Sequence, residues 1–348
     1  MILNEYNTGF SVATLNLFNY IAPPEAFYDT DNIYTQRQWQ EKEKWIHQQL
    51  KELNPDIVGF QEVFSPSSLE LLVKEHGLTH FVTVSDPGVG NQHVYDKPVV
   101  ALASKFPIVS ADEVKVPSSV IDKMKLQSGF HFSRPPIRAI VKIDDFTSVL
   151  VYVMHLKSKR SQLESGRLTT ENDNVMIADS LLAEIQGSWM STIQRGTEAI
   201  VIYHDIVEQM LVCERPVIVM GDLNDTIDSA ALQPLIGSHK LDRLDGKMIN
   251  NLPLAHQRIM DKFILHDAFD LQDKIKPEQR KSTHYFMNKG SVLDYILLSK
   301  DFKPEYDQSL ASVEEYRVND KHLINPHHID DAGCSDHASV MIEIEIRI

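Results

Sequence analysis

Two polar side chains, Asp222 and Asn224, directly follow a short apolar segment and could bind a cation, a water molecule or a phosphate oxygen. The apolar run Val217–Met220 is typical of a strand buried on both faces, and Gly221 then indicates a bend or a close backbone approach. In an extended chain, residues two apart point to the same side, so we expect the two polar side chains to lie together. The simpler interpretation is a polar turn that closes the strand, because Asp and Asn are common turn residues.

Other polar residues flank further predicted strands. We expect strands at about 10–18, 56–60, 81–84, 99–103, 137–143, 149–154, 292–298 and 340–348. The polar residues at their ends are Asn16, Glu62, His155, Asp336 and His337. Strands of one sheet often converge at one edge, so these side chains could share a cleft. Each alone is weak evidence, because single histidines and turn carboxylates are usually surface residues.

Asp294 is different, because it stands inside the apolar strand 292–298. Burying a carboxylate is costly unless it is paired or hydrogen-bonded. We therefore expect Asp294 to have a partner, and a histidine is the obvious candidate.

The elements between these strands are predicted unevenly. Apolar residues at helical spacing predict a helix over residues 34–53, ended by Asn54 and Pro55. Two long helical patterns follow His155, and the second places an apolar stripe on one face, formed by Trp189, Ile193, Ile200, Val207 and Leu211. Residues 228–280 give no clear elements, and residues 299–332 are interpreted as a long polar connection. With no repeat or linker in the sequence, we expect one domain over residues 1–348.

Composition limits the function classes. The 348 residues carry a formal net charge of −15, which argues against a protein that coats nucleic acid electrostatically. An enzyme that cuts phosphates remains compatible, because cations neutralise an acidic site locally. Two cysteines make neither a disulfide framework nor a zinc site. With no basic apolar leader and no apolar run of membrane length, we expect a cytoplasmic protein without membrane insertion and without an obligate protein partner.

Six short motifs occur in a consistent order: Thr14–Asn16, Gln61–Glu62, His155–Ser158, Gly221–Asn224, Leu293–Ile296 and Ser335–His337. Together they resemble the motif series of the endonuclease/exonuclease/phosphatase superfamily, the deoxyribonuclease-I-like fold, from about Phe10 to the C-terminus. The resemblance implies a four-layer α/β sandwich, in which two mixed β-sheets pack face to face between helices. It also implies a phosphoesterase that depends on Mg²⁺ or Mn²⁺.

The resemblance also implies metal ligands. Glu62 matches the principal metal carboxylate, Asn16 lies beside it, and Asp336 matches a further carboxylate of the metal site. Oxygen ligands of this kind suit Mg²⁺, which keeps several of its waters.

The catalytic residues are carried over in the same way. Asp222 and Asn224 match the pair that orients the attacking water and the scissile phosphate, and His337 matches a phosphate-contacting histidine held by Asp294. His155 matches the second histidine of the deoxyribonuclease and sphingomyelinase branches, either as an acid or as an electrostatic stabiliser.

The resemblance leaves the substrate-binding residues less defined. Arg134 resembles an arginine that approaches the phosphate in some members, and Arg138 competes for that role. A helical insertion at about 158–215 is larger than the minimal fold requires and is similar to an insertion in bacterial nuclease-like members. Its basic start either binds flanking phosphates or is a solvated helix start; its residues are Lys157, Lys159, Arg160 and Arg167.

The leading hypothesis is a divalent-metal-dependent phosphodiesterase, most specifically a nuclease acting on nucleic acid by in-line attack of water. A phosphatase or a sphingomyelinase-type lipid phosphodiesterase is the alternative; the latter would want an exposed apolar loop, and the sequence shows no clear one. A catalytically silent binding protein is an alternative of another class. It predicts gaps among the site residues, and the sequence has none.

Overall fold

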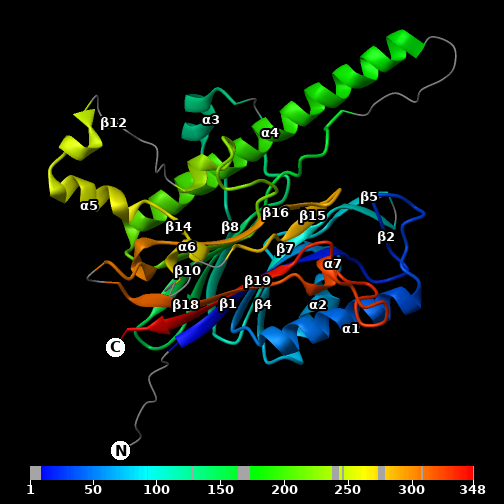
Figure 1. The fold of residues 1–348 in the computed structure, drawn as a ribbon, viewed down its shortest axis with the longest axis horizontal. Coiled ribbons are helices and arrows are strands. Elements are labelled where there is room, and N and C mark those ends of the chain that lie inside the picture. Colours follow the sequence, from blue (N-terminus) through cyan, green and yellow to red (C-terminus); the bar gives the residue numbers. More distant parts are fainter. Residues whose placement is uncertain are drawn as a thin grey trace, which may run out of the picture.

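Two six-stranded β-sheets pack face to face, with helices on both outer faces (Figure 1). The computed structural model describes residues 9–91, 93–126, 129–163, 173–236, 243–244, 247–272, 279–306 and 309–347. Both sheets are mixed, since each contains one parallel pair of strands among antiparallel pairs. The expected four-layer α/β sandwich is therefore confirmed.

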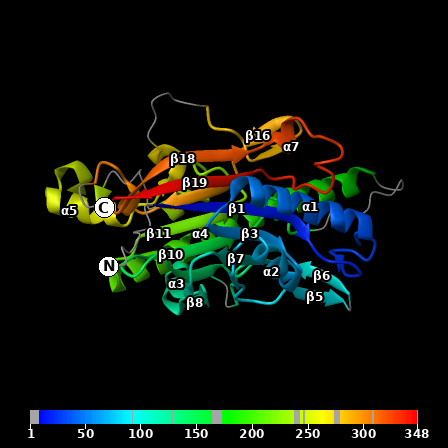
Figure 2. The same cartoon turned by 90° about the horizontal axis from the view of Figure 1, so that it is seen from below.

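The first sheet has the strand order β18-β19-β1-β3-β7-β4, most of which can be followed in Figure 2. Strands β1 and β3 are parallel, and the other neighbours are antiparallel. The bounds are β18 Ala311–Asn319, β19 Ser339–Ile346, β1 Gly9–Tyr20, β3 Ile57–Val63, β7 Val99–Ser104 and β4 His80–Val82.

The second sheet has the order β14-β17-β11-β10-β9-β8. Strands β10 and β11 at its centre are parallel, and the remaining pairs are antiparallel. The bounds are β14 His266–Asp267, β17 Asp294–Leu298, β11 Val217–Asp222, β10 Ser148–His155, β9 Ile137–Lys142 and β8 Ile108–Glu113.

Shorter elements join the sheets, including several between residues 228 and 280, where the sequence predicted none. The strands are β2 Ala26–Phe27, β5 Gly88–Asn91, β6 Val94–Lys97, β12 Arg243–Leu244, β13 Lys247–Met248, β15 His284–Phe286 and β16 Lys289–Ser291. The helices are α3 Ser118–Met124, α5 Leu254–Lys262, α6 Ala268–Leu271 and α7 Lys321–Ile324, with 3₁₀ turns η1 Gln233–Ile236, η2 Ile249–Asn251 and η3 Lys300–Phe302.

Helices α1 (Gln36–Leu53) and α2 (Pro66–Lys74) cover the first sheet. As expected, the helix over residues 34–53 forms, and Thr35 and Gln38 begin it with a capping box that satisfies free backbone N–H groups. Asn54 ends it in the left-handed conformation. Its buried side chains, among them Trp45 and Leu50, pack onto β1 and β3.

The 40-residue helix α4 (Asp173–Val212) covers the second sheet with its C-terminal half, and its N-terminal half projects beyond the sheets (Figure 1). The predicted apolar stripe was wrong, because Trp189, Ile193 and Leu211 are more than half exposed. The buried face is formed instead by Ala199, Val201, Ile202, Ile206 and Met210. Apolar residues occupy two faces of this helix, so periodicity alone could not identify the packed one. Where two helical patterns were expected after His155, the described residues form one long helix, α4. Residues 164–172, which precede it, lie outside the described residues.

The polar connection expected over residues 299–332 was also wrong, because it contains β18, which pairs with β19 along its length. A register shift between Val313 and Glu315 breaks the alternation of apolar and polar residues. Such a bulge hides the period of two by which a strand is recognised.

Among the described residues, no helix has both the length and the apolar composition that crossing a membrane would require.

Gly221 lies where the two central strands of the second sheet approach each other too closely for a side chain. We predict that Gly221→Ala destabilises the fold by about 2–5 kcal/mol. Its φ is +146°, and a Cβ there would lie 1.9 Å from the carbonyl oxygen of Met154 on β10. Chemical denaturation measures the decrease in stability. Gly196→Ala in α4 is the matched control: its Cβ would meet Ala231 at ordinary contact distance, so we expect a change within about 1 kcal/mol. Equal stability of the two variants would contradict this role of Gly221.

Candidate active site

The two sheets are joined at one edge by a hydrogen bond between Asn16 and Asp222. Alternate residues of β1 and β11 point into the core between the sheets, including Val12 on β1 and Ile218 and Met220 on β11. Asn16 and Asp222 continue the same faces at the period of two. The Asn16 amide donates to Asp222 Oδ2 over 3.1 Å, and both residues are buried. The polar edge is therefore the direct continuation of the apolar core.

Four side chains converge on Asp222. The Asn224 backbone N–H donates to Asp222 Oδ1 over 2.8 Å, and the Asn224 amide donates to Oδ2 over 3.2 Å. The Nε2 atoms of His155 and His337 lie 3.4 and 3.9 Å from Oδ2. Asn224 reaches this position through a turn with φ +54°, so the expected extended conformation ends at Asp222 although the two side chains do meet.

Asp294 has the histidine partner that its position in an apolar strand requires. His337 Nδ1 donates to Asp294 Oδ2 over 2.8 Å, and both residues are buried. The hydroxyl of buried Thr283 accepts hydrogen bonds from the backbone N–H groups of Leu293 and Asp294, which fixes the start of β17. This pairing directs the other ring nitrogen of His337 towards Asp222.

The two histidines have opposite protonation tendencies. Burial opposes charge on His337, but the carboxylates of Asp294 and Asp222 outweigh it and raise the pKa of His337 well above its ordinary value. Burial, then the nearby cations Arg134, His337 and Lys157, lower the pKa of His155 well below its ordinary value. Burial, with repulsion from Asp294 and Glu62, raises the pKa of Asp222 to about 7 against the opposing effect of His337. The site thus holds one charged and one neutral imidazole.

Irregular backbone around Glu62 sets the direction of its side chain. The pairing of β1 with β3 shifts register between Asn16 and Tyr20, and the pairing of β3 with β7 shifts between Phe60 and Val63. Glu62 itself has φ +60°, and its carboxylate accepts a hydrogen bond from the backbone N–H of Asn19 over 2.9 Å. Bulges of this kind re-aim side chains next to active sites.

A metal ion fits the chemistry of the donor set around Glu62. The negative charges of Glu62 and Asp336 affect the same two neighbouring side chains. Burial and these two carboxylates raise the pKa of Tyr34 to about 12. Burial lowers the pKa of Lys42 to about 8, and the two carboxylates oppose that decrease. Hard oxygen donors suit Mg²⁺ or Mn²⁺. Among the described residues, two groups of three bring their potential ligand atoms within 4.8 Å of one another: Asp222 with Asp294 and His337, and His284 with Asp336 and His337. Asp336 belongs to the second group, and Glu62 belongs to neither.

The structure separates the two candidate arginines. Arg134 donates to the carbonyl of Leu156 over 3.2 Å and is hydrogen-bonded to Tyr28. Its positive charge helps to lower the pKa of His155. Arg138 donates instead to Asp205 over 2.8 Å. Arg134 is therefore the arginine beside His155.

Residues in the middle of α4 fix the backbone of the basic segment next to His155. Buried Arg195 donates to the carbonyl of Lys157 over 3.0 Å, and Glu198 accepts from the Lys157 backbone N–H over 2.8 Å. Lys157 is half-buried, Lys159 pairs with Asp225 at 2.8 Å, and Arg160 is exposed. Arg167 lies outside the described residues.

Sequence reasoning missed several residues that shape this site, namely Tyr28, Lys42, Arg195, Glu198, Thr283 and His284. The Lys42 ammonium lies over the rings of Phe18 and Tyr34 and donates to the carbonyl of Gly333. The His284 ring lies 5.0 Å from that of His337. For Thr283 and His284, the only signal in the sequence was their position about ten residues before Asp294. Lys42 lies in charged helical sequence, and Arg195 is a single basic residue in a helix with few charges; neither setting indicates burial.

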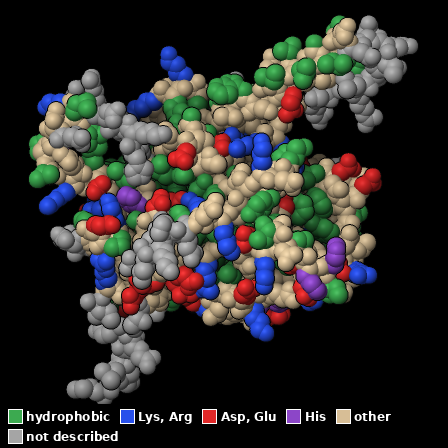
Figure 3. Space-filling model, viewed as in Figure 1, with side chains coloured by type: hydrophobic (Ala, Val, Ile, Leu, Met, Phe, Trp, Pro, Cys, Tyr) green, Lys and Arg blue, Asp and Glu red, His purple; other side chains and the backbone are tan. Residues whose placement is uncertain are grey.

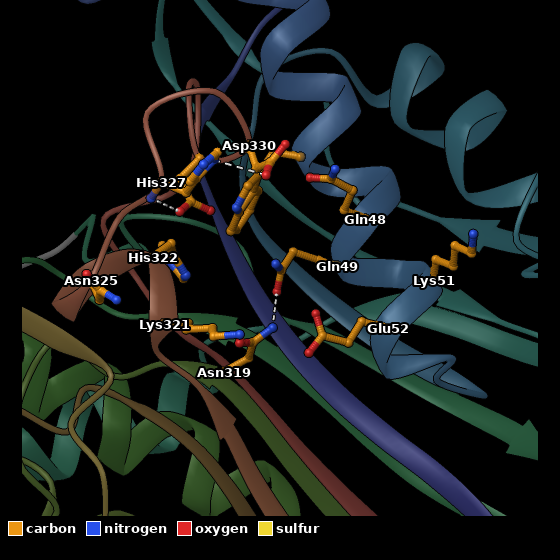
Figure 4. A pocket seen from close by; sticks show the side chains of 12 residues that line it. Gln48, Gln49, Lys51, Glu52, Asn319, Lys321, His322, Asn325, His327 and Asp330 are labelled. Atoms are coloured by element: carbon orange, nitrogen blue, oxygen red, sulfur yellow. Dashed lines mark hydrogen bonds and ion pairs between the residues drawn. The ribbon is translucent and has the colours of Figure 1, made fainter.

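A pocket of about 650 Å³ lies behind this site, between α1 and residues 319–331 (Figure 4). None of its lining residues belongs to the predicted site. Its buried His322 contacts the Trp45 ring and bonds through Nε2 to the carbonyl oxygen of His337 over 3.0 Å. The pocket thus adjoins the backbone that positions His337.

The family model for the endonuclease/exonuclease/phosphatase family matches residues 32–337. The chain belongs to this family. Its members are phosphoric ester hydrolases, and the resemblance stated from the six motifs is confirmed. A search of curated protein sequences finds no match.

Solved structures of the family share the fold at low sequence identity. The human Nocturnin catalytic domain with bound sulfate has a TM-score of 0.57 and 15% identity, over 98% of this chain and 96% of that one. A TDP2 from D. rerio, humanized by 14 mutations, has a TM-score of 0.54 and 14% identity, over 97% and 100%. An endonuclease/exonuclease/phosphatase from Bacteroides vulgatus has a TM-score of 0.53 and 16% identity, over 98% and 100%.

We predict that Asp294 and His337 work as one unit in phosphodiester hydrolysis. His337→Ala and Asp294→Asn should each lower kcat by about 10²–10⁴, the scale of a positioned acid–base group. The double variant should be little slower than the worse single variant, because each change disables the same unit. Steady-state rates on bis-p-nitrophenyl phosphate measure this.

Asp205→Asn is the matched control, since Asp205 is a buried carboxylate bonded to Tyr152 and Arg138 away from the site. It should lower stability with little change in kcat. Strictly multiplicative decreases in rate for Asp294 and His337 would show that they do not act together.

Proposed function

We propose that this protein is a divalent-metal-dependent phosphodiesterase and, more specifically, a nuclease. The observation that carries the proposal is the convergence of Asn16, Asn224, His155 and His337 on the Asp222 carboxylate. Hydrolysis of a phosphodiester needs an oriented water, a neutralised phosphate and a stabilised leaving group. A carboxylate between neutral and cationic imidazoles offers all three within one cluster.

Each residue has a role that follows from its contacts. Asp222 accepts hydrogen bonds and orients the attacking water, with Asn224 fixing its carboxylate. His337, kept charged by Asp294, binds the phosphate oxygens. Neutral His155 donates a hydrogen bond to the developing charge, and Arg134 beside it supplies a fixed cation.

Mg²⁺ or Mn²⁺ would be held by the carboxylates of Glu62 and Asp336 and by the side-chain amide oxygen of Asn16. The bound ion would supply Lewis-acid stabilisation of charge on the phosphate. Lys42, buried among the same carboxylates, keeps this region from accumulating uncompensated negative charge before a cation arrives.

Substrate panels distinguish the candidate activities. We expect turnover of DNA, RNA or both and of bis-p-nitrophenyl phosphate, and little turnover of a phosphomonoester or of sphingomyelin, each assayed with Mg²⁺ and with Mn²⁺. Preference for the monoester would favour a phosphatase, and preference for sphingomyelin a lipid phosphodiesterase. No turnover of any substrate would favour a binding protein without catalysis.

Metal removal is expected to abolish activity. EDTA should stop turnover and Mg²⁺ or Mn²⁺ should restore it, because the cluster of carboxylates and imidazoles leaves the phosphate charge incompletely neutralised. Glu62→Gln should raise the metal concentration for half-maximal rate by more than about tenfold. Glu70→Gln should not change it, because Glu70 is paired with Lys74 on α2, away from the site. Full activity of the chelated enzyme would refute the metal assignment.

The basic segment should bind phosphates that flank the scissile bond. Replacing Lys157, Lys159 and Arg160 with Gln should raise KM for a polynucleotide. It should also flatten the log–log salt dependence of binding by roughly 0.7–0.9 for each phosphate that the variant no longer neutralises. Activity on bis-p-nitrophenyl phosphate should barely change, because this substrate has no flanking phosphates.

Lys44→Gln, Lys51→Gln and Lys74→Gln together are the control for net charge, because all three lysines lie on the helices over the first sheet. An unchanged KM and salt slope in the variant of the basic segment would reduce the segment to a solvated helix start. Equal decreases in activity on both substrates would place it in catalysis or folding instead.

A further inference from the structure

The projecting half of α4 carries a row of large apolar side chains turned towards solvent. Figure 3 shows hydrophobic side chains along this arm of the molecule. Their exposed fractions are between 44% and 66%; the residues are Val175, Ile177, Leu181, Leu182, Ile185, Trp189, Met190 and Ile193. We call these eight residues the α4 stripe. A contiguous apolar surface of this length is uncommon on a monomeric protein.

The opposite face of the same helix is the one that touches the body. Gly187 is buried there, and a Cβ at that position would lie 1.9 Å from the hydroxyl oxygen of Ser161. The Ser191 hydroxyl donates to the carbonyl of Arg160 over 2.6 Å. The projecting half of the helix therefore touches its own chain through small and polar residues and leaves its large apolar residues outside.

Part of the stripe has the spacing of a coiled-coil seam. Val175, Leu182 and Trp189 recur every seven residues, and Ile185 follows Leu182 by three. The equivalent positions after Val175 and Trp189 are Ala178 and Thr192, which lie outside the stripe. Leu181 and Ile193 widen the apolar face on either side. Alternating steps of three and four are typical of a helix that packs against another helix.

The charges of the arm argue against a membrane surface as its partner. Between residues 174 and 194 the charged residues are Asp179 and Glu184, without any Lys or Arg. Helices that lie on lipid are rich in Lys and Arg on the polar face. An acidic, heptad-spaced helix fits a second helix better than it fits lipid headgroups.

The area of the stripe fits a weak, dissociable dimer. In the heptad register Ile177 and Met190 lie away from the seam, and the remaining six side chains, about half exposed, offer on the order of 500–600 Å² of surface, the contribution of each partner to an interface at the low end of the size range. A two-fold pairing sets the same patch against itself, so the stripe of one copy covers that of the other. We propose that this protein forms a homodimer through antiparallel or parallel pairing of α4 from two copies.

Sedimentation velocity of the full chain across a wide concentration range tests the proposal. We expect a species of about twice the 39.7 kDa chain mass that dissociates on dilution. Leu182→Glu with Ile185→Glu should raise the dimer dissociation constant by at least about tenfold. Leu211→Glu with Val212→Glu is the matched control, since these residues are equally apolar and exposed at the other end of α4 and lie outside the stripe.

Tryptophan emission adds a measurement on the unmodified protein. Trp39 and Trp45 are buried and Trp189 is 64% exposed, so a red shift on dilution reports that Trp189 has become uncovered. Circular dichroism confirms that the variants fold. A wild-type monomer at every concentration would overturn the proposal. Equal dimer dissociation constants for the stripe variant and the control variant would also overturn it. So would a monomer that binds phosphatidylcholine vesicles in a flotation assay.

Discussion

The active-site geometry depends on one constraint, the burial of the Asp222 carboxylate at the point where the two sheets meet. A buried carboxylate is stable only if polar partners satisfy it. Asn16 comes from the first sheet, Asn224 from the turn after β11, and His155 from the neighbouring strand β10. Because these partners come from both sheets, the packing angle and register of the sandwich fix the distances among the reacting groups.

The charge balance around Asp222 explains why the site extends so far into the core. His337 remains charged only because Asp294 and Asp222 flank it, and Asp294 is buried on β17 with its backbone held by Thr283. Removing one member of such a group leaves another buried charge uncompensated. The same reasoning applies to Arg195, which ties α4 to the segment after His155. Helix α4 is thereby tied to the segment that follows His155, while its outer half is free to contact another molecule.

Much of the fold and site was predictable because strands with short apolar runs end in unusual polar residues. The need of Asp294 for a partner led to its histidine, and the order of six motifs led to the family. The sequence did not reveal β18, since a bulge interrupts its alternation, or the packed face of α4, since two of its faces are apolar. Lys42 was missed because it stands among many other charged residues of α1, and Arg195 because a single basic residue in α4 gives no local sign of burial. The single-domain organisation and the role of each site residue stay predictions.

In the proposed metal site, Glu62 and Asp336 hold a divalent ion beside the Asp222–His337 cluster. Anomalous diffraction at the manganese edge, from crystals grown with Mn²⁺ and a non-hydrolysable phosphodiester, tests this site without reliance on activity. We expect one strong peak in contact with both carboxylates, directly or through water, and a phosphate against His337. A manganese peak away from Glu62 and Asp336, or a phosphate bound without any ion near them, would show that these carboxylates do not hold the metal.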